Sequence, residues 1–196
     1  MKRLFDIIVS LIALTIFLPF GIIIAVSILL SSKGGVFYRQ QRIGKNGIPF
    51  SLWKFRTMKP DSDKLGQLTV GMNDIRITKI GGFLRRYKLD EFPQFINVFM
   101  GEMSVVGPRP EVEKYVNLYN DEQWKVLTVR PGITDYASLE YFKENEILGN
   151  ADDPERTYIE EVMPAKLALN KKYLMNPGIL RDFKIMWLTF LKMVKR

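Results

Sequence analysis

The chain contains no histidine and no cysteine among its 196 residues. Disulfide bonds and thiol chemistry are therefore excluded, and the usual nitrogen and sulfur ligands of zinc are missing. A bound metal would have to be a hard, oxygen-liganded cation, with Mg²⁺ the leading candidate. General acid or base chemistry must fall to Asp, Glu, Lys or Tyr side chains. Neither a Walker-type Gly-rich loop nor a dinucleotide fingerprint is present.

The net charge of +8 is concentrated in the N-terminal part of the chain. Residues 1–60 hold nine Lys or Arg residues and one acid, whereas residues 61–196 hold 20 of each sign. The excess of positive charge therefore flanks a single apolar segment. This pattern is more typical of binding to an anionic membrane surface than of nucleic-acid binding, so membrane lipids are expected partners and nucleic acid is not.

The apolar segment runs from Leu4 to Leu30 and is long enough to cross a bilayer core of about 30 Å. A cleaved signal peptide is disfavoured, because the segment is long and lacks a small-x-small site. A proline, Pro19, near the middle and basic residues on both flanks argue against an ordinary spanning helix. The alternative is a re-entrant helical hairpin that enters and leaves on one membrane face. From physical reasoning alone the spanning and re-entrant interpretations remain about equally supported.

The rest of the chain, residues 34–196, predicts an α/β domain that is mostly helical, with one small β-hairpin and no large sheet. Two alternating runs within Val36–Met58 flank a turn at residues 44–47 and predict the hairpin. Residues 59–75 are polar and predict a surface loop, and a helical pattern begins near Ile77 with a weak point at Gly81-Gly82.

The segment "LDEFPQFINVFMG" predicts a helix that begins near Asp90, with Asp90 as its cap, and ends at Gly101. Residues 134–161 are strongly acidic and predict a solvated segment. The C-terminal "GILRDFKIMWLTFLKMVKR" predicts an amphipathic helix, either in the membrane interface or on the core with a solvated face.

The adjacent carboxylates Asp90 and Glu91 are the main candidates for chemistry. Taken alone, the pair is weak evidence for catalysis, because acidic residues at the start of a helix usually only cap the helix. Arginines nearby strengthen the case, since guanidinium groups suit phosphate oxygens. Together these residues predict a site for a polyanion, with carboxylates to hold Mg²⁺. The basic candidates are Arg85, Arg109 in a Pro-Arg-Pro turn, Arg130 before a Pro-Gly turn, and the Lys54 and Arg56 pair.

In order along the chain, the motifs "QQRIGKNGIPFSLWKFRTM", "FLRRYKLDEFPQFINVFMGEMSVVGPRP" and "VRPGIT" resemble the bacterial sugar transferases, the monotopic phosphoglycosyl transferases. The resemblance runs from about residue 2 to the C-terminus. It implies a re-entrant membrane helix over residues 1–33, broken at Leu18-Pro19, and a catalytic domain over residues 34–196. The domain would lie on the cytoplasmic face of the bacterial inner membrane.

The resemblance also implies a reaction and the residues that carry it. A phosphosugar would move from a UDP-sugar to polyprenyl (undecaprenyl) phosphate, through a covalent intermediate on Asp90, as the first membrane step of surface glycan synthesis. Mg²⁺ would be held by Glu91. Phosphate oxygens would be bound by Arg85 and Arg109, with support from Lys54 and Gln94. Arg130 is a further phosphate-binding candidate, from its place before the Pro-Gly turn and not from the resemblance.

The segment after "VRPGIT" departs from the family pattern. Where many members continue "RPGITG", this chain has Asp135 and Tyr136, so residues 135–160 leave the sugar undetermined. The alternatives are a Mg²⁺-dependent lipid-phosphate phosphatase, a non-catalytic membrane scaffold and, more weakly, a nucleic-acid binder. The oligomeric state and the glycan pathway are not specified by any of these patterns.

Overall fold

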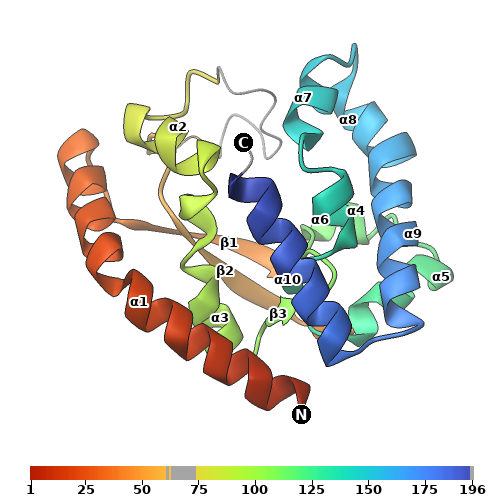
Figure 1. Ribbon diagram of the computed structural model, residues 1–196. Coiled ribbons are helices and arrows are strands. Elements are labelled where there is room, and N and C mark those ends of the chain that lie inside the picture. Colours follow the sequence, from red (N-terminus) through yellow and green to blue (C-terminus); the bar gives the residue numbers. More distant parts are fainter. Residues whose placement is uncertain (61, 63–73, 195–196) are drawn as a thin grey trace.

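The computed structural model describes residues 1–60, 62 and 74–194 (Figure 1). Most of the polar loop expected at residues 59–75 lies outside the described residues. The α-helices are α1 (Lys2–Ser31), α2 (Lys79–Arg86), α3 (Gln94–Met100), α4 (Glu113–Val116), α5 (Asp121–Trp124), α6 (Tyr136–Glu140), α7 (Glu144–Gly149), α8 (Pro154–Thr157), α9 (Met163–Leu174) and α10 (Ile179–Val194). The strands are β1 (Phe37–Ile43), β2 (Pro49–Phe55), β3 (Ser104–Val106) and β4 (Gly132–Thr134). Short 3₁₀ turns are η1 (Lys45–Gly47), η3 (Leu89–Glu91) and η4 (Lys125–Thr128), and η5 (Tyr158–Val162) is a π-helical turn.

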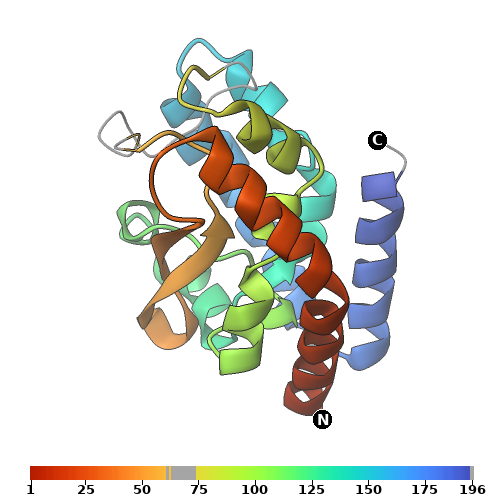
Figure 2. The same ribbon diagram turned by 90° about the vertical axis from the view of Figure 1, so that its left-hand side faces the viewer.

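Helix α1 is, among the described residues, the one helix long and apolar enough to cross a membrane. It continues through Pro19, so the expected break at Leu18-Pro19 does not divide it into two helices. Figures 1 and 2 show that its two halves run in different directions, and that the chain does not turn back on itself within the helix. A proline removes one hydrogen bond and bends a helix, but the turns on either side can remain intact.

The polar side chains in the first turns of α1 all contact the rest of the protein. The buried Asp6 carboxylate accepts hydrogen bonds from Ser104 Oγ at 2.9 Å and from the Val105 backbone N–H at 3.0 Å. Arg3 donates to the carbonyls of Val98 and Phe99 at the end of α3. The acid that interrupts the apolar sequence is therefore explained by docking onto β3, not by contact with lipid.

The other end of α1 is also attached to the domain. Arg56, at the end of the β-hairpin, donates to the carbonyls of Ser32 and Lys33, which lie just beyond the last helical residue. Ile28 is buried in a cluster with Phe55 and Leu84. Arg56 thus satisfies carbonyls that a helix end leaves without partners, and both ends of α1 contact the same domain.

The predicted β-hairpin is confirmed. Strands β1 and β2 pair antiparallel from Phe37 opposite Phe55 to Ile43 opposite Pro49. The fully buried Asn97 fastens this hairpin to α3, because its amide accepts from the Trp53 N–H at 3.0 Å and donates to the Ser51 carbonyl at 2.8 Å. The hairpin therefore carries Lys54 to a fixed position beside α3.

A second, parallel pair of strands was not predicted. Strand β3 pairs with β4, with Ser104 opposite Gly132 and Val106 opposite Thr134. A Cβ atom on Gly132 would lie 2.1 Å from the Gly107 nitrogen, so only glycine allows the two backbones to approach this closely. The pair brings the "GPRP" turn, which follows β3, next to the "VRPGIT" segment.

Helix α2 begins at Lys79 behind the cap Thr78, close to the expected start. The Gly81-Gly82 pair does not interrupt it. A Cβ on Gly81 would lie 2.0 Å from the Thr57 carbonyl oxygen, so this glycine is where α2 packs against the chain that follows β2. The apparent weak point is a site of close packing.

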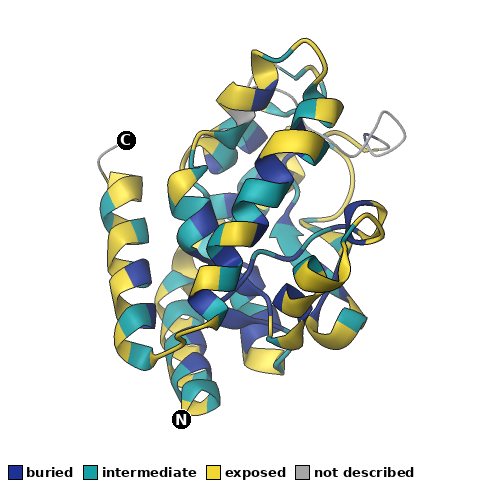
Figure 3. Ribbon diagram, turned by 90° about the vertical axis from the view of Figure 1, so that its right-hand side faces the viewer, coloured by how far each residue is buried: buried dark blue, intermediate teal, exposed yellow. Residues whose placement is uncertain are grey.

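The C-terminal helix α10 is amphipathic as predicted, and its outward stripe is apolar. Asp182 and Ile185 are fully buried, whereas Leu180, Phe183 and Trp187 are exposed. The buried Asp182 carboxylate binds Lys2 of α1 and accepts from Tyr173 Oη of α9 at 2.7 Å. Figure 3 shows buried residues gathered between the elements, with exposed residues on the outer turns of α10. The buried face with Asp182 and Ile185 attaches α10 to the domain, and the apolar stripe faces outward.

The docking of Asp6 predicts a stability effect. Replacing Asp6 with Ala leaves the buried Val105 N–H and the Ser104 hydroxyl without their acceptor, which should cost about 2 kcal/mol, or about 4–8 °C in Tm. Thermal unfolding of detergent-solubilised protein measures the change. Thr15→Ala is the control, because Thr15 is exposed on the same helix and binds only the Leu11 carbonyl. Equal Tm values for the two variants would contradict the assignment of Asp6 as an anchor.

Candidate active site

The two carboxylates lie on the single turn η3, between α2 and α3. Lys88 begins this turn with a positive φ of 57°, and α3 begins only at Gln94, after Pro93. The prediction that Asp90 caps the helix is therefore wrong, because the 3₁₀ turn separates it from the helix start. The predicted end at Gly101 is confirmed by its φ of 92°.

Glu91 is held by two cations from distant parts of the chain. Arg109, from the turn after β3, donates Nη1 to Oε2 at 3.1 Å and Nη2 to Oε1. Lys54 Nζ from β2 lies 3.3 Å from Oε1. Burial alone would raise the pKa of Glu91, but the charges of Arg109 and Lys54 hold that pKa well below its usual range. Glu91 is therefore a fixed anion that orients both cations.

Asp90 is in a different environment although it is the next residue. Its side chain is buried, at 8% exposure, and no hydrogen bond to its carboxylate is present in the part of the chain that the structure describes. Burial and the neighbouring Glu91 charge raise the pKa of Asp90 above that of an ordinary aspartate. A carboxylate that is poorly solvated and free of protein partners is available to react or to bind a ligand.

Two predicted phosphate-binding side chains near Asp90 retain free donors. Arg85 donates Nε to Thr57 Oγ1 at 2.9 Å, and within the described residues its two Nη groups have no recorded partner. Burial lowers the pKa of Arg85. Gln94 is 1% exposed, and its Nε2 has no hydrogen-bond partner in residues 1–60, 62 and 74–194. An unsatisfied buried donor at the start of α3 is costly unless a ligand accepts from it.

Arg130 is not brought to this cluster. Its Nε donates to the carbonyl of Gly101 at 2.6 Å, at the opposite end of α3 from Gln94. The structure thus gathers Lys54, Arg85, Asp90, Glu91 and Arg109, and leaves Arg130 outside the group. Gln94 follows Glu91 three residues later, in the first turn of α3. The role of Arg130 in binding phosphate stays a prediction without support from this arrangement.

Asp135 is a residue of the site that sequence reasoning treated only as a departure from the family pattern. It is 1% exposed, and its Oδ2 accepts from the Arg109 backbone N–H at 3.2 Å. Its Oδ1 accepts from the Ser138 N–H and caps α6. Asp135 therefore fixes the backbone of the turn that presents Arg109. Asp is a favoured helix cap because its side chain can accept from the N–H three residues later, and the sequence "DYAS", with Asp135 three residues before Ser138, carried that signal.

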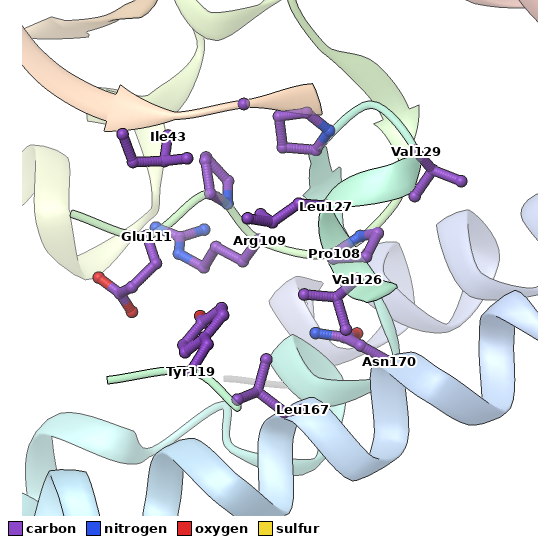
Figure 4. A pocket seen from close by; sticks show the side chains of 13 residues that line it. Ile43, Pro108, Arg109, Glu111, Tyr119, Val126, Leu127, Val129, Leu167 and Asn170 are labelled. Carbon is purple, nitrogen blue, oxygen red and sulfur yellow. The ribbon is translucent and has the colours of Figure 1, made fainter. Parts of the chain in front are cut away.

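A small cavity lies behind the Pro108–Pro110 turn, between η4 and α9 (Figure 4). Asn170 lines it, and its buried Oδ1 has no partner within the described chain. The side chains around it are mainly apolar, and Tyr119 closes one side. This cavity lies on the other side of the Pro108–Pro110 turn from the group that contains Asp90 and Glu91. Arg109 borders both.

The carboxylates of this group are the side chains that could hold a hard cation. No group of three acidic side chains able to hold a metal is found among the described residues. Glu91 already accepts three hydrogen bonds, of the roughly four positions a carboxylate offers, whereas the Asp90 oxygens are free. Two carboxylates fit Mg²⁺, because this cation usually takes one or two carboxylates and completes its shell with phosphate oxygens and water.

Two of the known proteins that this chain resembles are named as sugar-phosphate transferases that act on undecaprenyl phosphate. The chain is 39% identical over 201 residues to the UDP-glucose:undecaprenyl-phosphate glucose-1-phosphate transferase of Klebsiella pneumoniae, covering 97% of this chain and 39% of that protein. It is 38% identical over 142 residues to the UDP-N-acetylgalactosamine-undecaprenyl-phosphate N-acetylgalactosaminephosphotransferase of Aeromonas hydrophila, covering 70% and 33%. It is 40% identical over 148 residues to the exopolysaccharide production protein ExoY of Rhizobium meliloti, covering 68% and 66%.

The chain thus spans about two fifths of the length of the Klebsiella relative and about a third of the Aeromonas relative. The family model described as "Bacterial sugar transferase" matches residues 1–196. Because that match covers the described site and every element around it, the chain belongs to the bacterial sugar transferase family.

Proposed function

We propose that this protein is a phosphoglycosyl transferase that moves a phosphosugar from a UDP-sugar to undecaprenyl phosphate. The observation that carries the proposal is the contrast within the carboxylate pair: Glu91 is fixed by Arg109 and Lys54, whereas Asp90 is buried and has no hydrogen-bond partner among the described residues. The relatives are named for transfers of this kind, which supports the substrate classes. Their names differ in the sugar, so the sugar is left open.

The proposed reaction has two steps. A carboxylate oxygen of Asp90 attacks the sugar-linked phosphorus, the bond from that phosphorus to the UMP oxygen breaks, and UMP leaves. An oxygen of undecaprenyl phosphate then attacks the same phosphorus. The bond to Asp90 breaks, the carboxylate is restored, and undecaprenyl diphosphosugar is released. No histidine or cysteine is needed in either step, which suits a chain that has neither.

The remaining side chains would bind and orient the phosphates. Within the part of the chain that the structure describes, Arg85 offers two Nη groups without partners, and Gln94 offers a buried Nε2 without a partner. Donors that are already in place can stabilise charge that develops on phosphate oxygens without reorganising. Lys54 and Arg109 are already bound to Glu91. Their ion pairs with Glu91 would hold them in place, and they would supply positive charge around the diphosphate.

Mg²⁺ would be held by Glu91 beside Asp90, with donor phosphates and water completing its coordination. When bound, it would neutralise charge on the diphosphate as UMP leaves. Glu91 Oε2 keeps one acceptor position that could serve this purpose.

We further propose that α1 is re-entrant, so that both of its ends lie on the cytoplasmic face of the inner membrane. The contacts at its two ends support this: Lys2 and Arg3 bind α10 and α3, and Arg56 binds the carbonyls of Ser32 and Lys33. A helix that crossed a bilayer core of about 30 Å would place one end far from the domain. The bent apolar helix and the outward stripe of α10 would then face the same membrane surface.

The mechanism predicts a covalent adduct. Solubilised protein mixed with Mg²⁺ and a panel of UDP-sugars, without acceptor, should gain the mass of one phosphosugar in intact-protein mass spectrometry. Asp90→Asn should show no gain, and added undecaprenyl phosphate should remove the adduct from the wild type. UMP release only in the presence of acceptor, with no adduct for any donor, would contradict the two-step route.

The environment of Asp90 predicts the pH dependence of turnover. Protonation removes the nucleophile, so kcat/KM should fall on the acid side through a pKa above the roughly 3.9 of a free aspartate. The positive charge of Lys88 lowers the pKa of Asp90. Lys88→Asn removes that charge and tolerates the positive φ, so the acid limb should move to higher pH.

Lys88→Arg keeps the charge and is the matched control for this measurement. UMP release followed across a pH series gives both profiles. An acid limb that stays in place in Lys88→Asn, or moves to lower pH, would show that Asp90 is not the titrating group.

The topology is testable because the chain has no cysteine. One variant carries a cysteine in a tag before Met1, and a second carries Gly35→Cys, just beyond α1. Membrane-impermeant maleimide should label both in inverted membrane vesicles and neither in intact spheroplasts. Labelling of the two positions from opposite sides would establish a spanning helix instead.

A further inference from the structure

The turn that carries the carboxylates rests directly on the bent part of α1. Phe17, two residues before Pro19, stacks on Phe92 with ring centroids 3.6 Å apart and an interplanar angle of 17°. Leu89 packs against the cluster that contains Ile28 of α1. The residues immediately before Asp90 and immediately after Glu91 therefore both pack against groups that include α1 side chains.

The turn itself has little internal support. Its hydrogen bonds are long, with the Glu91 N–H donating to the Lys88 carbonyl at 3.4 Å and the Phe92 N–H donating to the Leu89 carbonyl at 3.3 Å. Lys88 also adopts a positive φ, which is unfavourable for a residue with a side chain. A single 3₁₀ turn with poor hydrogen bonds depends on packing for its position.

We infer that Phe17 is a positioning residue, which couples the bend of the membrane helix to the turn that carries Asp90. This inference rests on the proposed function for its kinetic consequence. Phe17 would not touch the substrate in this role. Its ring fixes Phe92, which follows Glu91 directly, and so sets where the neighbouring Asp90 carboxylate stands relative to the cations that bind phosphate. The bend of α1 is then part of the active-site framework as well as a membrane anchor.

Phe20 provides a matched control on the same helix. It is 60% exposed, and the ring contact recorded for it within the described chain is with Phe17, at a centroid distance of 6.4 Å. Phe20→Ala therefore removes the same side chain from an exposed position on α1 and leaves the stack of Phe17 on Phe92 in place.

The first measurement is steady-state kinetics of UMP release in nanodiscs containing undecaprenyl phosphate. Phe17→Ala should lower kcat by about tenfold or more, because small displacements of a nucleophile are costly, and should leave KM for the UDP-sugar nearly unchanged. Phe17→Tyr keeps the ring and should restore most of the activity, and Phe17→Leu should be intermediate. Phe20→Ala should resemble the wild type. Equal kcat values for Phe17→Ala and Phe20→Ala would overturn the inference.

The second measurement does not depend on the reaction. Amide hydrogen exchange in the segment 88–95 should become faster in Phe17→Ala and should be unchanged in Phe20→Ala, because the stack on Phe92 protects that turn. If the wild type releases no UMP from any UDP-sugar tested, the proposed function fails. The exchange experiment still decides whether Phe17 holds the turn. Unchanged exchange in Phe17→Ala would overturn the inference whatever the activity.

Discussion

The ion pair between Glu91 and Arg109 is the interaction on which the site depends. It joins the turn before α3 to the turn after β3, and Lys54 extends it to the β-hairpin. Removing one partner of this pair would leave a partly buried charge uncompensated, which costs more than the pair contributes in isolation. With Glu91 occupied in this way, Asp90 is left as the carboxylate without a partner among the described residues, and the chemical roles of the two neighbours separate.

The arrangement of α1 follows from a second set of polar contacts. Asp6, Arg3 and Lys2 are satisfied by β3, α3 and α10, and Arg56 satisfies the carbonyls at the other end. An apolar helix whose charged side chains all bind the domain can be docked along one face and still expose the rest of its surface to lipid. The same helix packs against the turn that carries Asp90 and Glu91, through the stack of Phe17 on Phe92. The proposed membrane attachment and the geometry of the candidate site therefore share one element.

Features with strong local signals could be predicted from the sequence. The hairpin, the end of α3 at Gly101 and the amphipathic C-terminal helix each depend on turn residues or periodicity, and the order of motifs identified the family. The parallel pairing of β3 with β4 could not be predicted, because it joins segments about 28 residues apart through two glycines at close approach. Asp90 was misread as a cap because its role depends on the position of Pro93 relative to a 3₁₀ turn. Arg130 is of a residue type that often binds phosphate and precedes a Pro-Gly turn, and only the fold shows that it lies at the far end of α3.

The claim that Asp90 and not Glu91 reacts can be tested by locating the intermediate within the chain. Borohydride reduces an acyl phosphate to the corresponding alcohol, which marks the modified carboxylate permanently. The protein would be loaded with the UDP-sugar that gives an adduct, reduced, digested and sequenced by tandem mass spectrometry. The account predicts an alcohol at position 90 and an unmodified carboxylate at position 91. A mark at position 91 would contradict it, because Glu91 would then have to leave Arg109 and Lys54 in order to attack.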